Sequence, residues 1–102
     1  KIKIKDYKGA ISDFNKAINI DSNFANAYMS KGYLKDELKN YKGAISEYNK
    51  GIKLDSNNST SYWNRGITKE KLGDLKGACE DWRKADSIGH KSASFWIKRQ
   101  CD

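Results

Sequence analysis

The residues whose side chains most often do chemistry are few in this sequence and stand apart from one another. His90 is the only histidine, and it lies in "SIGHKS", where a surface turn is expected. No nucleophile motif accompanies it, so the sequence offers no His-based pair for covalent catalysis. Asp36 and Glu37 are adjacent and point about 100° apart on a helix, which suits a general acid and base poorly. We interpret these two carboxylates as a solvated helix face.

The glycines and cysteines form no cofactor or metal motif. The eight glycines make neither a phosphate-binding loop nor a dinucleotide fingerprint. Cys79 and Cys101 lack the CxxC or Cys/His spacing of a zinc site, and two cysteines do not make a disulfide framework. A reducing compartment, the cytoplasm, is therefore the default expectation. The sequence predicts no enzyme, with no catalytic residue, no metal and no cofactor.

The composition is typical of one ordered domain. The chain has 102 residues, 37% of them apolar and 32% charged, with twelve aromatic residues and no proline. No apolar run approaches the roughly 18 residues that a membrane span needs. There is no signal-peptide pattern and no initiator Met, so we interpret the sequence as a processed chain or a fragment.

The net charge of +7 raises the alternative of a basic module that binds nucleic acid. Lysine supplies almost all of this charge, because only Arg65, Arg83 and Arg99 are arginine. Lysine also accompanies many Asn and Ile residues, as A/T-rich codon usage produces, and base readers favour Arg. We therefore regard nucleic acid as an unlikely partner and keep it as the alternative.

An internal repeat organises the whole sequence. "DYKGAISDFNKAINIDSN", "NYKGAISEYNKGIKLDSN" and "DLKGACEDWRKADSIGHK" start at Asp6, Asn40 and Asp74, at a constant interval of 34 residues. Apolar residues recur at helical spacing within each copy. A second helical segment lies between copies, from Phe24 and from Thr60, so each unit is predicted to be two helices. Asp, Ser and Asn in "DSNF" and "DSNN" are expected to cap the following helix.

This pattern resembles the tetratricopeptide repeat. Glycines in the first helix of a pair, alanines in the second and large aromatics one turn later carry the resemblance: Gly32, Gly66, Ala44, Ala78, Phe14, Tyr48 and Trp82. Tyr28 and Tyr62 stand where the family favours Trp. The sequence departs from the family where it has Lys31 and Arg65 for Leu, Lys35 and Lys69 for Tyr, and Ser22, Ser56 and His90 for Pro.

The resemblance implies an all-α fold, a right-handed superhelical stack of antiparallel helix pairs with a C-terminal capping helix. We expect a single domain with a truncated repeat over 1–24, repeats over 25–58 and 59–92, and a capping helix over 93–102. The chain is then the C-terminal part of a bacterial-type array. The family implies adaptor or assembly work, in which a concave groove binds a peptide or protein segment.

The groove is predicted from the residues of each first, inner helix that the core does not need. These residues are Asn26, Met29, Ser30, Tyr33, Thr60, Trp63, Asn64, Ile67, Ile97 and Lys98. Met29, Tyr33, Trp63 and Ile67 would form a continuous apolar strip. The alternative is that Trp63 and Tyr33 complete the core between helices. Asn64 and Lys98 match only part of the set with which some family members hold a terminal carboxylate, so no such clamp is predicted.

The opening "KIKIK" alternates like a strand, but the repeat places it differently. Lys1–Lys5 aligns with "KDELK" and "KEKLG", which predicts the last turn of an inner helix whose earlier part is missing. Ala10, Phe14 and Ala17 would then form an exposed apolar edge. We expect this edge to be covered by upstream residues or by a second copy of the chain, as a homodimer.

Two further expectations concern Cys79 and the outer lysines. Cys79 replaces Ile11 and Ile45 of the earlier copies, so it is either a small buried apolar residue or the partner of Cys101 in a bridge. Lysines recur once per repeat with an acid three residues before the second of them, and we interpret them as a solvated outer surface. These residues are Lys8, Lys42, Lys76, Lys16, Lys50, Lys84, Asp13, Glu47 and Asp81.

Overall fold

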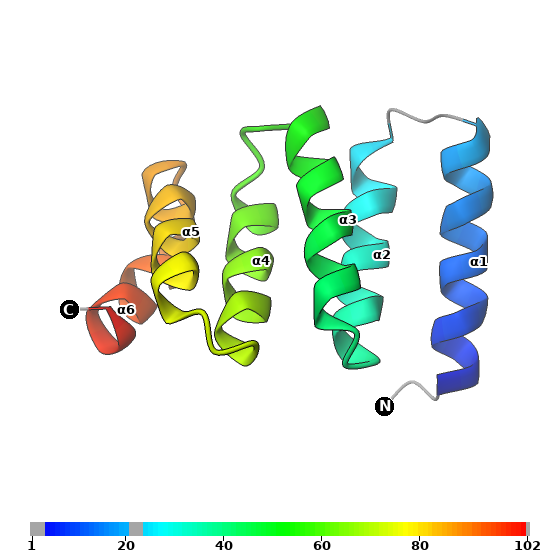
Figure 1. The fold of residues 1–102 in the computed structure, drawn as a ribbon. Coiled ribbons are helices and arrows are strands. Elements are labelled where there is room, and N and C mark those ends of the chain that lie inside the picture. Colours follow the sequence, from blue (N-terminus) through cyan, green and yellow to red (C-terminus); the bar gives the residue numbers. More distant parts are fainter. Residues whose placement is uncertain (1–3, 21–23, 102) are drawn as a thin grey trace.

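A computed structural model describes residues 4–20 and 24–101, and these residues form six α-helices and no strand (Figure 1). The helices are α1 (Ile4–Ile20), α2 (Ala25–Glu37), α3 (Tyr41–Leu54), α4 (Ser59–Lys71), α5 (Leu75–Ser87) and α6 (Lys91–Gln100). The predicted all-α class is confirmed. None of the described helices is both long and apolar enough to cross a bilayer.

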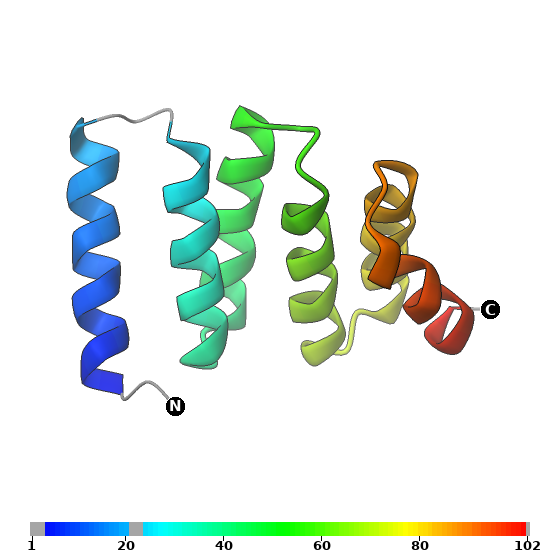
Figure 2. The ribbon, with the colours of Figure 1, turned by 180° about the vertical axis from the view of Figure 1, so that it is seen from behind.

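The helices stack in two layers along one direction. Contacts are densest within the pairs α2/α3 and α4/α5, and each helix also packs on the next one in the chain. Figure 1 shows α3 and α5 in front of α2 and α6, and Figure 2 shows the same layers from behind. The molecule is accordingly elongated, with extents of 41 × 26 × 20 Å. It is an α-solenoid in which α2 and α4 are inner helices and α1, α3 and α5 are outer helices.

Side chains at the turns fix where three of the helices begin. Asn40 caps α3 by accepting a hydrogen bond from the Gly43 N–H, and Asp74 caps α5 through the Gly77 N–H. Asn58 accepts from the N–H groups of Thr60 and Ser61 at the start of α4. The predicted capping role of "DSNN" is therefore confirmed at Asn58. The side chain of Phe24, at the equivalent position before α2, makes no such bond.

Three turns end their helices through a residue in the left-handed conformation. Gly73 and Gly89 have φ angles of 89° and 107°, which suit glycine. Lys39 occupies the same turn position after α2 with φ of 65°. The N–H of the following residue, Asn40, donates a hydrogen bond to the Lys35 carbonyl. The left-handed conformation of Lys39 thus lets the turn satisfy a carbonyl at the end of α2.

The core of each complete pair is a glycine on the inner helix against an aromatic ring on the outer helix. Tyr48 and Trp82 are each only 1% exposed, and Ala44 and Ala78 beside them are fully buried. A Cβ atom on Gly32 would lie 2.8 Å from the Tyr48 ring, and one on Gly66 would lie 2.6 Å from the Trp82 ring. The close approach that the sequence predicts at these glycines is confirmed.

The closing helix departs from the 34-residue interval. α6 begins at Lys91, two residues earlier than that interval from Ser59 would place it. Its third residue, Ala93, is fully buried, as are Ala27 and Ser61 at the third positions of α2 and α4. The turn after α5 is shorter because Gly89 reverses the chain, so Ile97 and Lys98 do not occupy the helix positions of Trp63 and Asn64.

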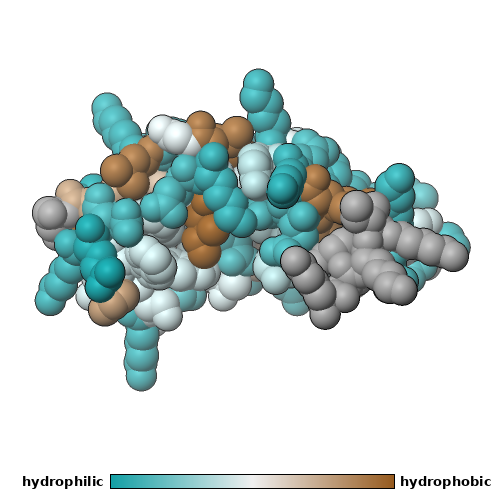
Figure 3. Space-filling view, turned by 90° about the horizontal axis from the view of Figure 1, so that it is seen from below, coloured by the Kyte–Doolittle hydropathy of each residue, from teal (hydrophilic) through white to brown (hydrophobic). Residues whose placement is uncertain are grey.

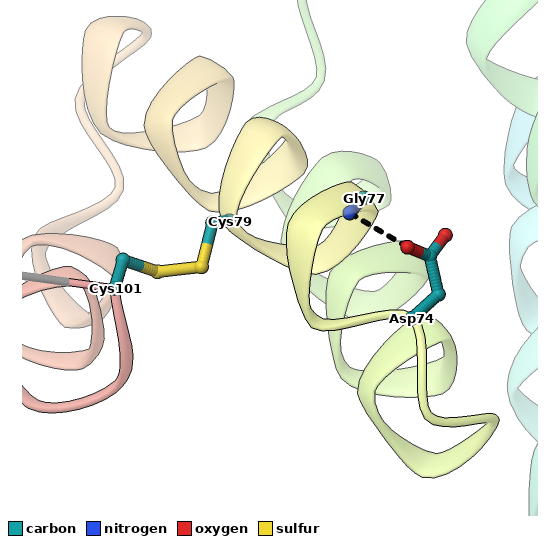
Figure 4. The surroundings of a disulfide bond; sticks show 4 residues. All are labelled: Asp74, Gly77, Cys79 and Cys101. Carbon is teal, nitrogen blue, oxygen red and sulfur yellow. Dashed lines mark hydrogen bonds between the residues drawn. A yellow bond between two sulfur atoms is a disulfide. The ribbon is translucent and has the colours of Figure 1, made fainter.

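A disulfide joins the closing helix to the last outer helix. Cys79 on α5 and Cys101 at the end of α6 are bridged, with Cα atoms 5.9 Å apart (Figure 4). Cys79 is also buried, at 6% exposure. It is therefore both a buried core residue and the partner of Cys101, the two roles expected for it. The bridge removes the argument for a reducing compartment, because structural disulfides persist mainly in oxidising ones.

The first helix begins differently from its copies. Ile4, Lys5 and Asp6 belong to α1 and continue directly into it, whereas the aligned residues 38–40 form the turn between α2 and α3. The prediction that this stretch is the last turn of an earlier helix is therefore wrong for Ile4 and Lys5, since no turn separates them from α1. Ile4 and Lys5 thus form neither a β-strand nor a turn, because both belong to α1. Lys1–Lys3 lie outside the described residues.

Replacing Lys39 by glycine should stabilise the fold. Glycine adopts the left-handed conformation without the steric cost of about 1 kcal/mol that an L-side chain carries, although it loses more entropy on folding. We expect the free energy of unfolding to rise by about 0.5–1 kcal/mol for Lys39→Gly in urea titrations. The reciprocal control, Gly73→Lys, should lower it by a similar amount. Equal stability of all three proteins would contradict the proposed strain.

Reducing the disulfide should destabilise the chain. The bridge closes a loop with a sequence separation of 22, which corresponds to about 3 kcal/mol of chain entropy. Circular dichroism melts should show Tm lower by roughly 10 °C or more with reductant. A Cys79→Ser/Cys101→Ser variant should melt at one temperature with and without reductant. Two free thiols in denatured, non-reduced protein would show that the bridge is absent.

Candidate functional site

An open pocket lies where α1, α2 and α4 meet. Its volume is about 430 Å³, and its wall is mostly apolar. The lining residues are Ala10, Phe14, Met29, Ser30, Tyr33, Leu34, Thr60 and Asn64. Five of the residues predicted for the groove and two predicted for the exposed edge thus share a single surface depression, which we call the edge pocket.

Tyr33 and Met29 play different parts in this pocket. Tyr33 is 52% exposed, so its ring is available for contact with another molecule. Met29 is only 9% exposed because it also joins α2 to α4. The Ser61 hydroxyl donates to the Met29 sulfur at 2.7 Å, and the Asn58 amide does so at 3.4 Å. Met29 is therefore part of the wall between α2 and α4, while the Tyr33 ring is exposed at the surface of the pocket.

Trp63 lies outside the edge pocket, in an aromatic cluster. Its ring stacks on His90 at a centroid distance of 4.8 Å and lies 6.1 Å from Trp82 and 6.5 Å from Trp96. The half-buried Trp63 therefore completes the packing between α4, α5 and α6, which was the alternative to its groove role. His90, expected in a surface turn, is half-buried as the residue before α6.

The other predicted groove residues are dispersed. Ile67 and Ile97 are partly buried against the same core cluster as Trp63. Ile67 also lines a smaller pocket of about 150 Å³ together with Tyr33 and Asn64. Asn26 and Lys98 are exposed and line neither pocket. The apolar strip predicted from Met29, Tyr33, Trp63 and Ile67 is therefore not continuous. Tyr33 lines the edge pocket, whereas Trp63 packs against the core cluster.

The residues of the predicted edge are more open than their copies. Ala10, Phe14 and Ala17 are half-buried in α1. The equivalent alanines and aromatic rings of α3 and α5 are buried beneath an inner helix. Ala10 and Phe14 line the edge pocket and Ala17 does not. The pocket therefore lies over the part of α1 that corresponds to the packed face of the other outer helices.

Glu47 is a buried carboxylate that links an outer helix to an inner one. It is 3% exposed on α3, and its Oε2 atom lies 2.7 Å from Lys35 Nζ and 3.1 Å from Lys31 Nζ. Burial raises the pKa of Glu47, but hydrogen bonds from the two lysines outweigh this effect and hold the pKa below its ordinary value. The carboxylate therefore stays charged and ties α3 to α2.

Asp81 repeats this arrangement one pair later. It is 4% exposed on α5 and accepts two hydrogen bonds from Arg65, at 2.6 and 2.8 Å. Lys69 lies 3.2 Å from the same carboxylate. The hydrogen bonds with Asp81 raise the pKa of Arg65, against the effect of burial. Both complete pairs are thus joined by one buried acid on the outer helix and two basic residues on the inner helix.

A third buried carboxylate joins the two inner helices. Asp36 on α2 is 6% exposed, accepts a hydrogen bond from the Thr68 hydroxyl and lies 2.6 Å from Lys71 Nζ on α4. Burial lowers the pKa of Lys71, but the bond with Asp36 outweighs burial and raises it overall. The solvated interpretation of Asp36 is therefore wrong, because its neighbour on α4 covers it. Glu37 is exposed as expected.

The ion pairs of Glu47 and Asp81 with the inner helices were not predicted from the sequence. Glu47 and Asp81 were assigned to a solvated outer surface with Lys50 and Lys84, but both acids are buried and bind the inner helices. Lys50 Nζ lies 3.9 Å from Glu47, as the weakest of its three contacts. The signal was present, because the basic departures from the family pattern recur with the same 34-residue interval as the acids. The outer lysines themselves are exposed as predicted.

The side of the molecule that Figure 3 shows from below, where the α2–α3 and α4–α5 turns lie in Figure 1, is mainly hydrophilic with separate hydrophobic patches. The large exposed hydrophobic residues of the described chain are distributed over several helices and turns: Phe24, Tyr33, Leu54, Leu72, Leu75 and Phe95. Among the described residues, no group of three or more His, Cys, Asp or Glu side chains is placed to hold a metal ion.

Comparison with known families agrees with this architecture. A family model described as "TPR repeat" matches residues 37–73, and one described as "Tetratricopeptide repeat" matches residues 1–24. Together these matches cover more than half of the chain. The chain belongs to the tetratricopeptide repeat family. The six helices of residues 4–20 and 24–101, packed in adjacent pairs, are the solenoid expected of that family.

Solved tetratricopeptide structures are similar over most of the chain. The Arabidopsis OM64 TPR domain is 26% identical with a TM-score of 0.88, and the alignment covers 94% of this chain and 81% of that one. The first TPR of Spaghetti (RPAP3), solved with the HSP90 peptide SRMEEVD, is 20% identical with a TM-score of 0.86, covering 93% and 77%. At that identity the likeness shows the fold alone.

A third similar structure belongs to a longer chain. MamA is 24% identical with a TM-score of 0.78 over 81% of this chain, and the chain spans 48% of the MamA chain, about half its length. No curated protein sequence matches the chain. The comparisons therefore fix the repeat family and its fold.

The lowered pKa of Glu47 predicts an acid-sensitive contribution to the stability of this tetratricopeptide domain. A carboxyl whose folded pKa lies below its unfolded value stabilises the fold above the unfolded pKa, about 4.3, and loses this contribution as the pH falls through the folded pKa. Glu47→Gln should therefore lower the free energy of unfolding by about 1–3 kcal/mol at pH 7 and by less at pH 3. Urea titrations at pH 7, 5 and 3 measure this difference.

An exposed carboxylate provides the matched control. Glu80→Gln on α5 should change the stability by no more than about 0.5 kcal/mol at each pH. If wild type and Glu47→Gln differ by the same amount at pH 7 and pH 3, the ion pairs of Glu47 do not carry the pH dependence.

Proposed function

We propose that this chain is a non-catalytic interaction module that binds a peptide or protein segment in the edge pocket and along the adjoining surface of α2 and α4. The observation that carries the proposal is the pocket of about 430 Å³ lined by residues of three helices. Its mixture of an exposed aromatic ring, aliphatic walls and the polar groups of Ser30, Thr60 and Asn64 suits a peptide.

The internal electrostatics favour a protein partner over nucleic acid. The basic residues of the inner helices are engaged by buried carboxylates, as for Lys35 with Glu47, Arg65 with Asp81 and Lys71 with Asp36. Their charges are largely neutralised within the fold, so they contribute little to a phosphate-binding stripe. The family membership and the peptide complex of the Spaghetti repeat support the same class of partner.

The contact surface of the pocket is expected to centre on Tyr33. Asn64 on α4 lines the pocket together with Tyr33. A half-exposed ring supplies apolar contact area, while the amide offers both a donor and acceptors to a peptide backbone. Asn26, Trp63, Ile67, Ile97 and Lys98 remain candidates of lower weight in this proposal, because they lie outside the pocket.

A library selection tests the proposal without assuming a partner. Random 12-residue peptides displayed on phage are selected on the wild-type chain, synthesised and titrated by fluorescence anisotropy. We expect Tyr33→Ala to weaken their binding by about fivefold or more, because the ring covers the open side of the pocket. Asn64→Ala should weaken them less. Phe95→Ala on α6 is the matched control, since Phe95 is 58% exposed and distant from the pocket residues in the chain.

Two results would contradict the proposal. Selected peptides that depend on Phe95 and not on Tyr33 would place the binding surface elsewhere. Tight, steeply salt-dependent binding of a generic 20-nucleotide RNA, with no peptide selected, would favour the nucleic-acid alternative. Trp63→Ala should lower Tm strongly because it opens the aromatic cluster. The binding of this variant is therefore measured only at temperatures where a melting curve shows that it is folded.

A further inference from the structure

The smaller pocket between the inner helices differs in its chemistry from the edge pocket. Its volume is about 150 Å³, and its lining residues come from α2, α3 and α4, which lie between other described helices. Three of these residues are charged, Asp36, Glu37 and Lys71, whereas all lining residues of the edge pocket are uncharged. Two carboxylates stand against one ammonium group, so we call it the acidic pocket.

One carboxylate of the acidic pocket is not neutralised. Asp36 lies 2.6 Å from Lys71 Nζ and accepts a hydrogen bond from the Thr68 hydroxyl, so Asp36 and Lys71 form an ion pair. Glu37 is exposed and forms no ion pair with another residue of the described ranges 4–20 and 24–101. The charge that complements the pocket is therefore a single positive charge.

The uncharged lining residues favour a planar cation with several hydrogen-bond donors. Burial raises the pKa of the Tyr48 phenol, and the charge of Asp36 adds to this effect, so the hydroxyl stays neutral close to that carboxylate. The Asn64 amide also lines the pocket and offers an oxygen acceptor. Tyr33, which is 52% exposed, contributes a ring on which a guanidinium stacks.

The size of the acidic pocket suits one side chain and not a helix. Arginine carries five N–H donors in one plane, whereas the ammonium group of lysine is compact and strongly hydrated. The acceptors available to these donors are the carboxylate of Glu37, the remaining lone pairs of Asp36, the Tyr48 hydroxyl and the Asn64 amide. Arginine therefore fits this set of acceptors better than lysine does.

We propose that the acidic pocket binds an arginine side chain of the peptide whose apolar residues lie in the edge pocket. This inference rests on the proposed function and names one residue that the partner must carry. The guanidinium binds Glu37 and Asp36, while its aliphatic stem packs against Ile67. Tyr33 and Asn64 line both pockets, so a single peptide reaches from one pocket into the other.

The net charge of +7 does not oppose this contact at short range. The lysines that recur once per repeat lie on the outer helices α1, α3 and α5, whereas the acidic pocket is lined mainly by the inner helices. Charges further away than the Debye length of about 8 Å are largely screened at physiological ionic strength. The nearest basic residue, Lys71, is already held by Asp36.

The 12-residue peptides selected from the phage library on the wild-type chain provide the probe. We expect arginine to be enriched among them by about threefold or more over the unselected library. The tightest arginine-containing peptide is synthesised again with glutamine or lysine in place of this arginine. On the wild-type chain, glutamine should weaken binding by about tenfold or more, and lysine by less, because lysine keeps the charge and loses the planar donors.

A double-mutant cycle then tests the contact with Glu37. On Glu37→Gln, replacing the peptide's arginine by glutamine should weaken binding by only about threefold or less, since the acceptor charge is already gone. Glu37 is exposed, so circular dichroism should show an unchanged fold. Glu80→Gln on α5 is the matched control, because Glu80 is exposed and lies outside the acidic pocket. This variant should keep the full difference of about tenfold.

Two outcomes would overturn the inference. The first is a set of selected peptides without enriched arginine. The second is an arginine whose replacement weakens binding equally on wild type and on Glu37→Gln, because that arginine then binds elsewhere. Peptides that depend on Tyr33 but carry no arginine leave the interaction module intact and remove only this inference. A library that yields no binding peptide removes the proposed function and this inference with it.

Discussion

The structure depends on the contact between a glycine on one helix and an aromatic ring on the next. Tyr48 and Trp82 are buried only because Gly32 and Gly66 let the backbone of the inner helix approach the ring directly. This contact sets the spacing within each pair, and the spacing in turn brings the basic residues of the inner helix within reach of a buried carboxylate. Without the glycine the two helices would stand further apart, and both the ring and the carboxylate would be exposed.

Three buried carboxylates give this solenoid polar contacts between its helices. Glu47 and Asp81 each bind two basic residues of the inner helix, and Asp36 connects α2 to α4. A buried ion pair contributes less to stability than an apolar contact of the same size, but removing one partner leaves an uncompensated charge. These pairs therefore specify which helix packs on which, and they make the match between inner and outer helices a matter of charge as well as shape.

Each stage of a stacked fold leaves a face that the next helix covers. At the C-terminal side α6 covers α5 and is held by the bridge between Cys79 and Cys101. At the other side the described residues leave Phe14 and Asp13 of α1 open beside the edge pocket. Residues whose copies Tyr48 and Glu47 are buried in the interior therefore lie at the surface on this edge.

Most of the fold could be predicted from the sequence, and less of the candidate site. The constant interval and the periodic apolar residues predict the helices, and the glycine and aromatic positions predict how each pair packs, because these signals are local or repeat identically. Ser30, Tyr33, Thr60 and Asn64 were predicted to face a groove, and all four line the edge pocket. Trp63 was expected in the same strip but stacks on His90 and packs beside two other tryptophans. Helix α5 and the turn after it are each one residue shorter than α3 and its turn, which moves α6 by two residues.

The sequence by itself determined the number of helices in each repeat, their order and the residue types at the contacts between them. Only the tertiary structure decided which charged residues are buried, whether the two cysteines meet, and which predicted groove residues share a pocket. The physical reason is that burial and contact depend on the distance between residues far apart in the chain. Asp36 is covered by Thr68 and Lys71 of another repeat, and no local pattern around Asp36 reveals that neighbour.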